Sequence, residues 1–305
     1  MDKMKFKVFE SSEGNVWKYV FTSDEIVTET VLYKYNSFEE RTVICCSVQS
    51  GCRVGCSFCG TGRHFIRSLT PDEIMYQVET TFKDKNIETD KVKKLQIMFM
   101  SMGEPMDNID NVIKTIRRLN KKYPNAQLLL STVGLKNDEA FNKIIKISKE
   151  IDKVGLQFSI HEPTDERRNK LIPFKNKYTL RELRNKGIEW WNATGRNVYL
   201  NYVVTNKNNS IEDANKLMDL FSPVVFKFTF SVLSEPNKDK IEESIKQRDE
   251  ELSRILKFQE LFLKNGYNTR VFNPAGQDDI GGGCGQLHYV QDYFKQKKHV
   301  FLMKY

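Results

Sequence analysis

GCRVGCSFCGTG, residues 51–62, places Cys52, Cys56 and Cys59 at a C-x-x-x-C-x-x-C spacing. They are three of only six cysteines in a chain of 305 residues. A structural zinc site or a fully ligated iron–sulfur cluster takes four protein ligands, and no fourth cysteine follows at a suitable local spacing. Three thiolates on a four-iron cluster leave one iron open. The spacing, with the aromatic Phe58 before the last cysteine, therefore predicts a cluster with an open iron.

An open iron can chelate the amino and carboxylate groups of S-adenosylmethionine (SAM) and deliver an electron to its sulfonium. This is the arrangement of radical SAM enzymes. The tripeptide GEP at residues 103–105 follows the next predicted strand, where the backbone and the Glu104 carboxylate could hold the SAM ammonium. The two features together predict a [4Fe–4S] cluster on Cys52, Cys56 and Cys59, with SAM as the second cofactor.

The charge and the N-terminal residues bear on partners and compartment. A formal net charge of +8 favours a polyanionic partner, although a solvated basic surface explains the charge equally well. The first residues contain no apolar leader, and no apolar run approaches the roughly 20 residues of a membrane span. We expect a cytoplasmic protein without membrane attachment. In that compartment clustered cysteines bind metal or react more often than they form structural disulfides.

Apolar β-branched runs alternate with segments of helical periodicity along most of the chain. The predicted strands fall within residues 42–49, 94–105, 126–134, 154–162, 196–205, 224–233 and 268–274, and the predicted helices within 71–84, 110–123, 138–150, 180–194, 211–221 and 240–265. This alternation predicts an α/β fold with a parallel sheet, a partial (β/α)6-type radical SAM barrel. Residues 1–40 are predicted to form a short antiparallel β extension, and residues 41–305 the barrel with a C-terminal loop that contains a late cysteine.

In such folds the active residues gather at the carboxyl ends of the strands. Gly103 and Glu104 follow the second predicted barrel strand, Ser131 ends the third, and Ser159 and His161 end the fourth. The loop GQDDIGGGCGQL, residues 276–287, adds a late cysteine among glycines. We expect these loops and the cysteine cluster to meet at one mouth of the barrel.

Six stretches resemble the RlmN/Cfr family of dual-cysteine radical SAM enzymes, which methylate adenosine in RNA. They cover nearly the whole chain: ETV (29–31), RTVICCSVQSGCRVGCSFCGTG (41–62), FMSMGEP (99–105), STVG (131–134), FSIHEP with DERRNKLIP (158–173) and GQDDIGGGCGQL (276–287). The most specific feature is a cysteine seven positions before the cluster, Cys45, together with the late Cys284 in a DI-x-x-x-CGQL context. Radical SAM enzymes at large do not need this pair.

The resemblance implies a chemistry for both extra cysteines. A first SAM methylates Cys284, and a second SAM gives a radical that removes hydrogen from the new methyl group, so two SAM are used per turnover. The resulting methylene adds to the adenine ring. Cys45 then releases the product by forming a disulfide with Cys284, and Glu29 matches a glutamate associated with accepting the ring proton. The reset requires a thiol reductant, and the cluster requires an electron donor such as flavodoxin or ferredoxin.

The resemblance also implies a SAM site formed by Gly103, Glu104, Ser131, Ser159, Ile160, His161 and Ser234. Taken singly, the serines are ordinary strand-end hydroxyls and His161 fits a structural polar role equally well. Cys46 has no counterpart role in the family. Because neighbouring side chains on a strand point to opposite faces, we interpret Cys46 as a small buried hydrophobe facing away from Cys45.

Three features depart from the family pattern. The chain begins close to the β extension, where relatives carry a further helical domain that helps to grip RNA, so the choice of substrate is open. Ser234 stands where the family has a SAM-binding asparagine and has a shorter reach. GGG at 281–283 replaces the usual small and acidic residues, which predicts a looser loop.

The leading hypothesis is methylation of carbon 2 of adenosine in ribosomal or transfer RNA, with carbon 8 as the nearest variant. A radical SAM enzyme acting on a peptide or another non-RNA substrate is a second hypothesis, and a non-catalytic nucleic-acid binding module is a third. We expect a monomer. Arg63, His64 and Arg67, then Arg167 and Arg168, and the KQKKH segment at 295–299 are candidate RNA contacts, although each also fits a solvated surface.

Overall fold

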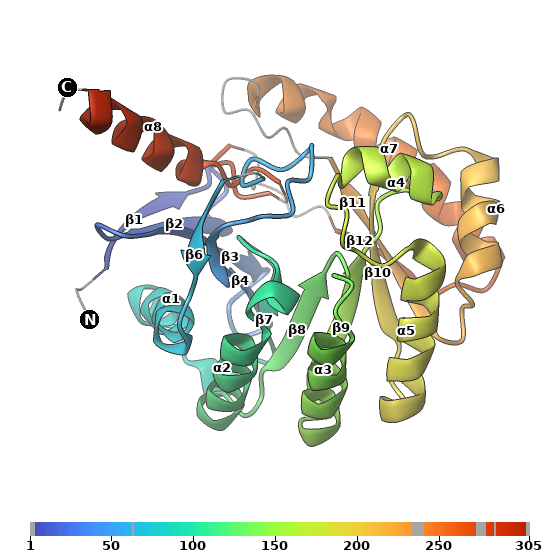
Figure 1. Cartoon of the computed structure of the whole chain (residues 1–305), viewed down its shortest axis with the longest axis horizontal. Coiled ribbons are helices and arrows are strands. Elements are labelled where there is room, and N and C mark those ends of the chain that lie inside the picture. The colour runs from blue at the N-terminus through green and yellow to red at the C-terminus, as the bar shows by residue number, and fades with distance from the viewer. Residues whose placement is uncertain (1–3, 63, 234–240, 273–278, 284, 303–305) are drawn as a thin grey trace.

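The computed structural model describes residues 4–62, 64–233, 241–272, 279–283 and 285–302. They contain one ten-stranded sheet in the order β1-β2-β3-β4-β7-β8-β9-β10-β11-β12, curved around a central space with helices outside it (Figure 1). Its strands are β1 (Lys5–Glu10), β2 (Val16–Thr22), β3 (Val27–Tyr35), β4 (Arg41–Cys46), β7 (Lys94–Phe99), β8 (Gln127–Thr132), β9 (Val154–Ser159), β10 (Val198–Val204), β11 (Phe226–Val232) and β12 (Thr269–Phe272).

Within this sheet, β4, β7, β8, β9, β10, β11 and β12 pair in parallel with their neighbours in that order. The helices are α1 (Pro71–Asp84), α2 (Ile109–Lys122), α3 (Asp138–Glu150), α4 (Asp165–Leu171), α5 (Leu180–Thr194), α6 (Ile211–Leu220), α7 (Ile241–Lys264) and α8 (Tyr289–Leu302), with 3-10 turns η1 (Thr89–Lys91) and η2 (Pro105–Asn108). Within the described residues β1 and β12 are the two edges of the sheet, and they do not pair with each other. The predicted partial, open barrel is therefore confirmed.

Local sequence fixes where several outer helices begin. Thr70 and Glu73 form a reciprocal capping box at the start of α1, and Thr179 and Glu182 form another at the start of α5. Ser210 caps α6 in the same way. These side chains bond the backbone N–H groups that a helix start leaves without partners, which stabilises each start by about 1 kcal/mol. Each cap thereby fixes the residue at which its helix begins.

The N-terminal strands form the predicted antiparallel extension. β1 pairs with β2 and β2 with β3, and the turn between β1 and β2 contains Gly14 at a φ of +59°. β3 then pairs antiparallel with β4, so the extension continues the barrel sheet and places Val31 opposite Cys45. Side chains of β2 and β3 therefore lie near the first barrel strand. A domain boundary at residue 40 stays a prediction.

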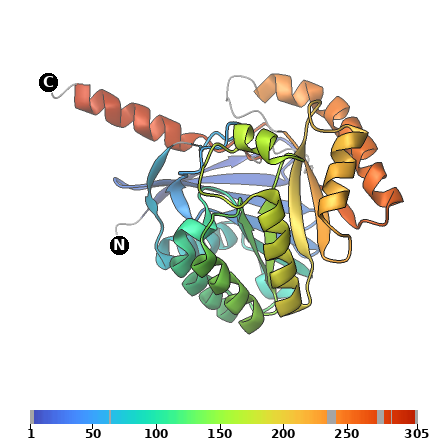
Figure 2. The ribbon, with the colours of Figure 1, turned by 45° about the vertical axis from the view of Figure 1, so that its right-hand side comes forward.

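Two features of the fold were not predicted. The apolar run at 42–49 is broken after Cys46, and a short antiparallel ribbon of β5 (Gln49–Gly51) and β6 (Phe65–Ser68) brackets the cysteine motif. Helix α8 extends from the body of the molecule in both views (Figures 1 and 2). In the part of the chain that the structure describes, no helix is long and apolar enough to cross a bilayer.

Candidate active site

The cluster loop, residues 52–62, lies between β5 and β6 and carries the three motif cysteines. Its backbone is held by hydrogen bonds from Cys52 N to His64 O (2.6 Å), Cys59 N to Cys56 O (3.1 Å) and Gly62 N to Cys59 O (3.0 Å). A Cβ at Gly62 would lie 2.9 Å from Cys56 O, so the turn depends on glycine there. The loop is a tightly folded unit that brings all three thiols to one wall.

A cavity of about 100 Å³ separates the cluster loop from the carboxyl ends of β7 to β10. Its lining includes Cys52, Cys56 and Cys59 and the predicted SAM-site residues Gly103, Glu104, Ser131, Ser159 and His161. Ile160 does not line it, because its side chain is fully buried in the core while its N–H bonds Asn201 O. Ser234 lies outside the described residues. The structure therefore brings the predicted loops together at one mouth, with Ile160 behind the surface.

Glu104 is almost fully buried and held by the backbone. Its carboxylate accepts hydrogen bonds from Met106 N (3.0 Å) and Val133 N (2.9 Å). Burial raises the pKa of Glu104 to about 7, against the opposing effect of these donors and the Thr132 hydroxyl. An ammonium group entering the cavity would favour the ionised form. The carboxylate is thus fixed in place and suited to a cationic ligand.

His161 presents a neutral ring to the same cavity. Its Nδ1 accepts a hydrogen bond from Val203 N (3.2 Å), which places the proton on Nε2, and burial lowers its pKa to about 3. The ring contacts Phe58 edge to face, with centroids 5.1 Å apart. His161 has a φ of +60°, a left-handed conformation that is uncommon for non-glycine residues. The local backbone therefore turns this ring toward the cluster loop as a fixed hydrogen-bond donor.

The adjacent cysteines of β4 point to opposite faces of the sheet. Cys45 lines a small cavity of about 40 Å³ together with Cys59, Thr61, Tyr33 and three glycines, Gly282, Gly283 and Gly285. Cys46 is fully buried in the main core, where its thiol donates to Met98 O at 3.6 Å. Burial raises the pKa of the Cys46 thiol to about 12. Cys45 thus faces the cluster loop, and Cys46 packs as the small buried hydrophobe that the strand geometry predicts.

Glu29 lies on β3 with no exposed surface. Lys18 of β2 approaches its carboxylate at 3.5 Å, and Tyr289 N donates to the other oxygen at 3.0 Å. Burial is the largest effect and raises the pKa of Glu29 to about 7, although Lys18 and Tyr289 N oppose it. A carboxylate with a pKa near neutrality can both accept and release a proton at physiological pH. The environment of Glu29 therefore fits the predicted proton acceptor.

The residues that flank position 284 are tied to this site, while Cys284 itself lies outside the described residues. Gly281 O accepts from Lys18 Nζ (3.1 Å), and Gly282 O accepts from the Tyr33 hydroxyl (2.9 Å). Gly60 N donates to Gly285 O at 2.6 Å. A Cβ at Gly285 would lie 2.8 Å from Phe58 O, so this close approach excludes larger residues. Hydrogen bonds hold both flanks, and the looser loop expected from the glycines stays a prediction.

The predicted RNA contact at Arg168 is wrong. Its guanidinium is fully buried and donates to Tyr178 O (2.8 Å) and Val133 O (2.6 Å). It also reaches Ser159 O at 3.4 Å, so it ties the loops that follow β8 and β9 beneath the cavity. A cation with these bonds has no surface to offer to RNA. The sequence of residues 165–171 predicts a charged helix with its arginines in solvent. The inward direction of Arg168 depends on the packing of this helix against the rest of the fold.

The other basic residues predicted to contact RNA differ in how far their side chains are already bonded within the protein. Arg167 is paired with Glu162 (2.8 Å) and Asp213 (2.7 Å). Arg67 makes a two-pronged pair with Glu73 at 2.6 and 2.9 Å. His64 is partly buried, with Nδ1 3.0 Å from Gly62 O. Arg63 lies outside the described residues, as do the side chains of the last three residues of KQKKH. Both described arginines are thus engaged by carboxylates, and their contact with RNA stays a prediction.

Sequence reasoning missed two residues of the site, Asn201 in the cavity wall and Gln49 behind Glu104. Asn201 lines the cavity from β10, and its Oδ1 accepts from Ser231 Oγ at 2.7 Å. Gln49 accepts from Glu104 N through its side-chain oxygen (3.0 Å) and donates to Asp107 (2.8 Å). The polar interruption of the apolar run VYLNYVV was the available signal for Asn201. Gln49 gave no signal, because its role depends on the strand break after Cys46.

The residues present fit an iron–sulfur cluster. Burial raises the pKa of the Cys52 thiol to about 12 and that of the Cys59 thiol above its usual value, so cationic iron is the kind of partner that would stabilise their thiolates. Val54 N–H donates to Cys52 sulfur, and Thr61 and Gly62 N–H donate to Cys59 sulfur. Among the described residues no three metal-binding side chains surround a single ion. A four-iron cluster differs, since each thiolate binds its own iron.

Comparison with known proteins identifies the family of this chain. Residues 46–221 match the model of the radical SAM superfamily. The chain is 33% identical to "Probable dual-specificity RNA methyltransferase RlmN" of Finegoldia magna over 92% of this chain and 77% of that protein. It is 35% identical to the protein of the same name from Thermotoga neapolitana over 81% and 68% of the two chains. The crystal structure of a radical SAM methyltransferase from Sphaerobacter thermophilus superposes with a TM-score of 0.76 and 27% identity, covering 93% and 80%.

Proposed function

We propose that this chain, which belongs to the radical SAM superfamily and within it to the RlmN family of RNA methyltransferases, adds a methyl group to carbon 2 of adenosine in RNA through a methylated cysteine. Membership makes the chain a radical SAM RNA methyltransferase that uses a [4Fe–4S] cluster and SAM. The position on the base, the cysteine intermediate and the roles of single residues are the parts that we propose.

The observation that supports the two-cysteine route best is the orientation of β4. Cys45 lines the small cavity together with Cys59 of the cluster loop and with Gly283 and Gly285, the described neighbours of position 284. Cys46 points into the core on the opposite face. A radical SAM enzyme without a second reactive cysteine has no need of a thiol at this place. The lining supports Cys45 as the partner of Cys284.

Cys52, Cys56 and Cys59 would hold the cluster, and Glu104 with the strand-end groups of Ser131, Ser159 and His161 would hold SAM. When bound, the cluster and SAM supply a radical that can remove a hydrogen atom from a methyl group. Glu104, fixed by two backbone N–H groups, orients the ammonium of SAM. His161, held neutral by burial, donates a hydrogen bond from Nε2 and adds no charge beside the sulfonium.

The remaining residues carry the one-carbon unit and the protons. Cys284 takes a methyl group as a thioether, and SAM leaves as S-adenosylhomocysteine. The same carbon later joins the Cys284 sulfur to the adenine ring. The adduct gives up one electron, for which the cluster would be the acceptor, and Glu29 accepts the proton of the substituted ring carbon. Cys45 thiolate then attacks the Cys284 sulfur, the carbon–sulfur bond breaks with its electron pair going to the carbon, and protonation of that carbon completes the methyl group. Two equivalents of an external thiol reduce the resulting disulfide and restore both cysteines. A flavodoxin or a ferredoxin is the expected electron donor.

Nucleoside analysis tests the proposal. Purified enzyme with a reconstituted cluster is incubated anaerobically with SAM, a reductant and unmodified ribosomal or transfer RNA, and the digested RNA is examined by mass spectrometry against authentic standards. We expect 2-methyladenosine, carrying label from methyl-labelled SAM. 8-Methyladenosine alone would move the reaction to carbon 8. The absence of both, together with SAM cleavage stimulated by peptide extracts, would overturn an RNA substrate.

A further inference from the structure

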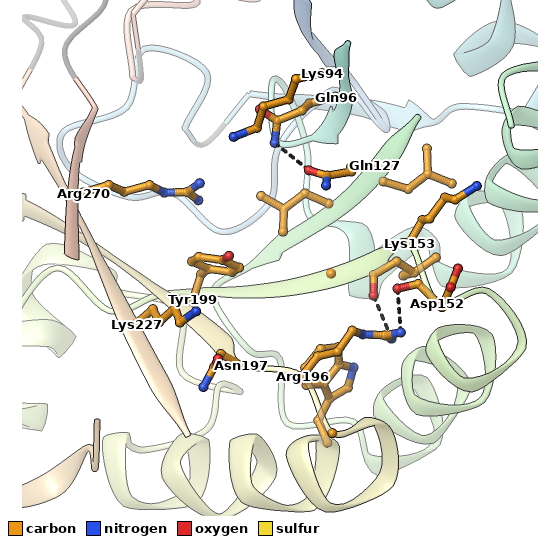
Figure 3. Close-up of a pocket in the computed structure, with 16 residues that line it drawn as sticks. Lys94, Gln96, Gln127, Asp152, Lys153, Arg196, Asn197, Tyr199, Lys227 and Arg270 are labelled. Atoms are coloured by element: carbon orange, nitrogen blue, oxygen red, sulfur yellow. Dashed lines mark hydrogen bonds between the residues drawn. The ribbon is translucent and has the colours of Figure 1, made fainter. Parts of the chain in front are cut away.

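The amino-terminal end of the barrel contains a larger cavity than the carboxyl end does. It has a volume of about 550 Å³ and is lined by the first residues of successive strands, including Lys94 of β7, Gln127 of β8, Lys227 of β11 and Arg270 of β12 (Figure 3). None of the three cluster cysteines lines it. In parallel α/β barrels this end ordinarily serves stability, and catalysis takes place at the other. A hollow of ligand size here needs a separate explanation.

Positive charge accumulates around this cavity. Lys94, Lys227 and Arg270 line it, and Arg41 lies close enough to Lys94 and Arg270 to affect both. Burial first, and then repulsion from Arg41 and Arg270, lowers the pKa of Lys94; burial and Arg41 also lower the pKa of Arg270. Among the described residues none of these four cations forms an ion pair with a carboxylate. One carboxylate, that of Asp152, also lines the cavity but forms no ion pair with these four cations. Like charges in excess of this single carboxylate raise the free energy of the empty site, and an anionic ligand would reverse that effect.

The cations differ in whether their hydrogen bonds are already used. Arg196 donates to three main-chain oxygens, of Ser148, Asp152 and Val154, and therefore serves the fold. Lys153 donates to Pro124 O. In contrast, the ammonium groups of Lys94 and Lys227 have no hydrogen-bond partner among the described residues. Arg270 uses only Nε, which donates to Thr229 Oγ1 at 2.8 Å, so both terminal nitrogens remain for a ligand.

The geometry of these groups fits phosphate. Figure 3 shows the Arg270 side chain crossing toward the middle of the cavity, with Lys94 and Tyr199 on either side of it. The guanidinium lies over the Tyr199 ring, 4.5 Å from its centroid, which holds its plane and its fork of donors in place. A planar fork with two separate ammonium groups suits several phosphate oxygens at once, whereas a single carboxylate would satisfy only part of it.

We propose that the amino-terminal cavity binds a small molecule carrying two or more linked phosphate groups, held by Lys94, Lys227 and Arg270. The ligand is a small molecule and not an RNA chain because the donors line a hollow of limited volume between strand ends. Gln127 and Asn197 provide uncharged polar lining for the rest of the ligand. This site lies at the opposite end of the strands from the candidate active site. A test of ligand binding here is therefore independent of a test of the proposed methylation.

Calorimetry with inorganic pyrophosphate tests the site. The cluster-loaded enzyme, without RNA or SAM, is titrated anaerobically, and we expect saturable one-to-one binding. Lys94→Gln and Lys227→Gln should each raise the dissociation constant about tenfold or more, since each removes a charged donor. Lys264→Gln is the matched control: it removes the same charge from an exposed position on α7, where the ammonium pairs with Glu260. Lys264→Gln should bind pyrophosphate as the unaltered enzyme does.

Three outcomes would overturn the proposal. The first is no binding at millimolar pyrophosphate. The second is binding that neither cavity variant weakens, or that all three variants weaken equally, because the probe would then bind elsewhere or respond only to net charge. The third is no pyrophosphate binding together with a loss of RNA affinity in Lys94→Gln, which would assign the cavity to RNA. Circular dichroism confirms that each variant is folded before it is titrated.

Discussion

The two ends of the parallel strands place opposite kinds of polar group around the same sheet. At the carboxyl ends, thiols and the Glu104 carboxylate line small cavities, and two backbone N–H groups hold that carboxylate. At the amino ends, Lys94, Lys227 and Arg270 line a large cavity and keep donors available. The first end is built to fix groups in position. The second end is built to accept an outside charge.

The difference has a physical cause in burial. Glu29 and Glu104 are removed from water, so their pKa values rise to about 7, and each can change protonation state when a cation or a proton acceptor arrives. Lys94, Lys227 and Arg270 at the amino end are not fully buried. A reaction that moves protons and electrons needs the first environment, and recognition of a polyanion needs the second. One sheet thus supports two different chemistries at its two ends.

The largest expected effect separates the two faces of β4. In Cys45→Ala, methylation of Cys284 and SAM cleavage should continue, but product release should stop and RNA should remain covalently attached to the protein. The reason is that the thiol facing the small cavity is lost while the cluster loop is intact. A denaturing gel with labelled RNA measures the adduct. Cys284→Ala should give no adduct at all.

Cys46→Ala is the matched control for that experiment. It removes a thiol of the same size from the adjacent position, in the core, and should lower stability by about 1 kcal/mol without trapping RNA. If Cys46→Ala traps RNA, or if Cys45→Ala releases methylated RNA at the normal rate, the assignment of the resolving cysteine is wrong. The orientation of Cys45 and Cys46 to opposite faces of β4 would then not explain which cysteine reacts.

The next effect concerns Arg168, which supports the active end from below. Arg168→Met removes the donor from Val133 O and Tyr178 O and leaves these buried carbonyl groups without it. We expect the free energy of unfolding to fall by about 3 kcal/mol. Arg167→Gln, one residue earlier, removes a partly exposed guanidinium from Glu162 and Asp213 and should lower it by less, about 1 kcal/mol. Urea unfolding compares the two, and equal small losses would show that Arg168 is not needed to join the loops.

The sequence predicted the elements with strong periodicity and the residues at strand ends. Parallel strands separated by amphipathic helices place Glu104, Ser131 and His161 at one mouth whatever the details of packing. The partners of those residues were not predictable. Whether a charged residue on a short helix points outward, as at Arg167, or inward, as at Arg168, depends on what lies beneath the helix. The ion pair between Lys18 and Glu29 depends on strand register.

A smaller effect concerns Lys18 and tests how the active end tunes Glu29. Lys18→Met removes the cation that lowers the pKa of Glu29, so burial and the nearby Asp292 carboxylate act unopposed except by Tyr289 N. The pKa should rise by about one unit or more above its value of about 7. Because a base works only when deprotonated, the rising limb of the pH–rate profile should move to higher pH by that amount.

Single-turnover formation of methyladenosine from pH 6 to pH 9 measures the shift. Lys18→Arg keeps a cation near the carboxylate and should restore most of the profile. If Lys18→Met lowers the rate equally at every pH, Lys18 acts only as packing for Gly281 and the aromatic rings around it. If Glu29→Gln retains the same rising limb as the unaltered enzyme, another group accepts the ring proton.

The smallest expected effect is that of Arg67, which lies on β6 shortly after the cluster loop. Its guanidinium already makes two charge-assisted hydrogen bonds with Glu73, and Glu25 lies 3.6 Å away. Binding an RNA phosphate would compete with these bonds, so Arg67→Gln should weaken RNA binding by no more than about threefold. The salt dependence tells more than the affinity, because each lost phosphate contact lowers the slope of log K against log [salt] by about one. We expect the slope to stay unchanged in Arg67→Gln. A slope lower by about one would show that Arg67 leaves Glu73 when RNA binds, and the active end of the barrel would then also contribute a cation to RNA recognition.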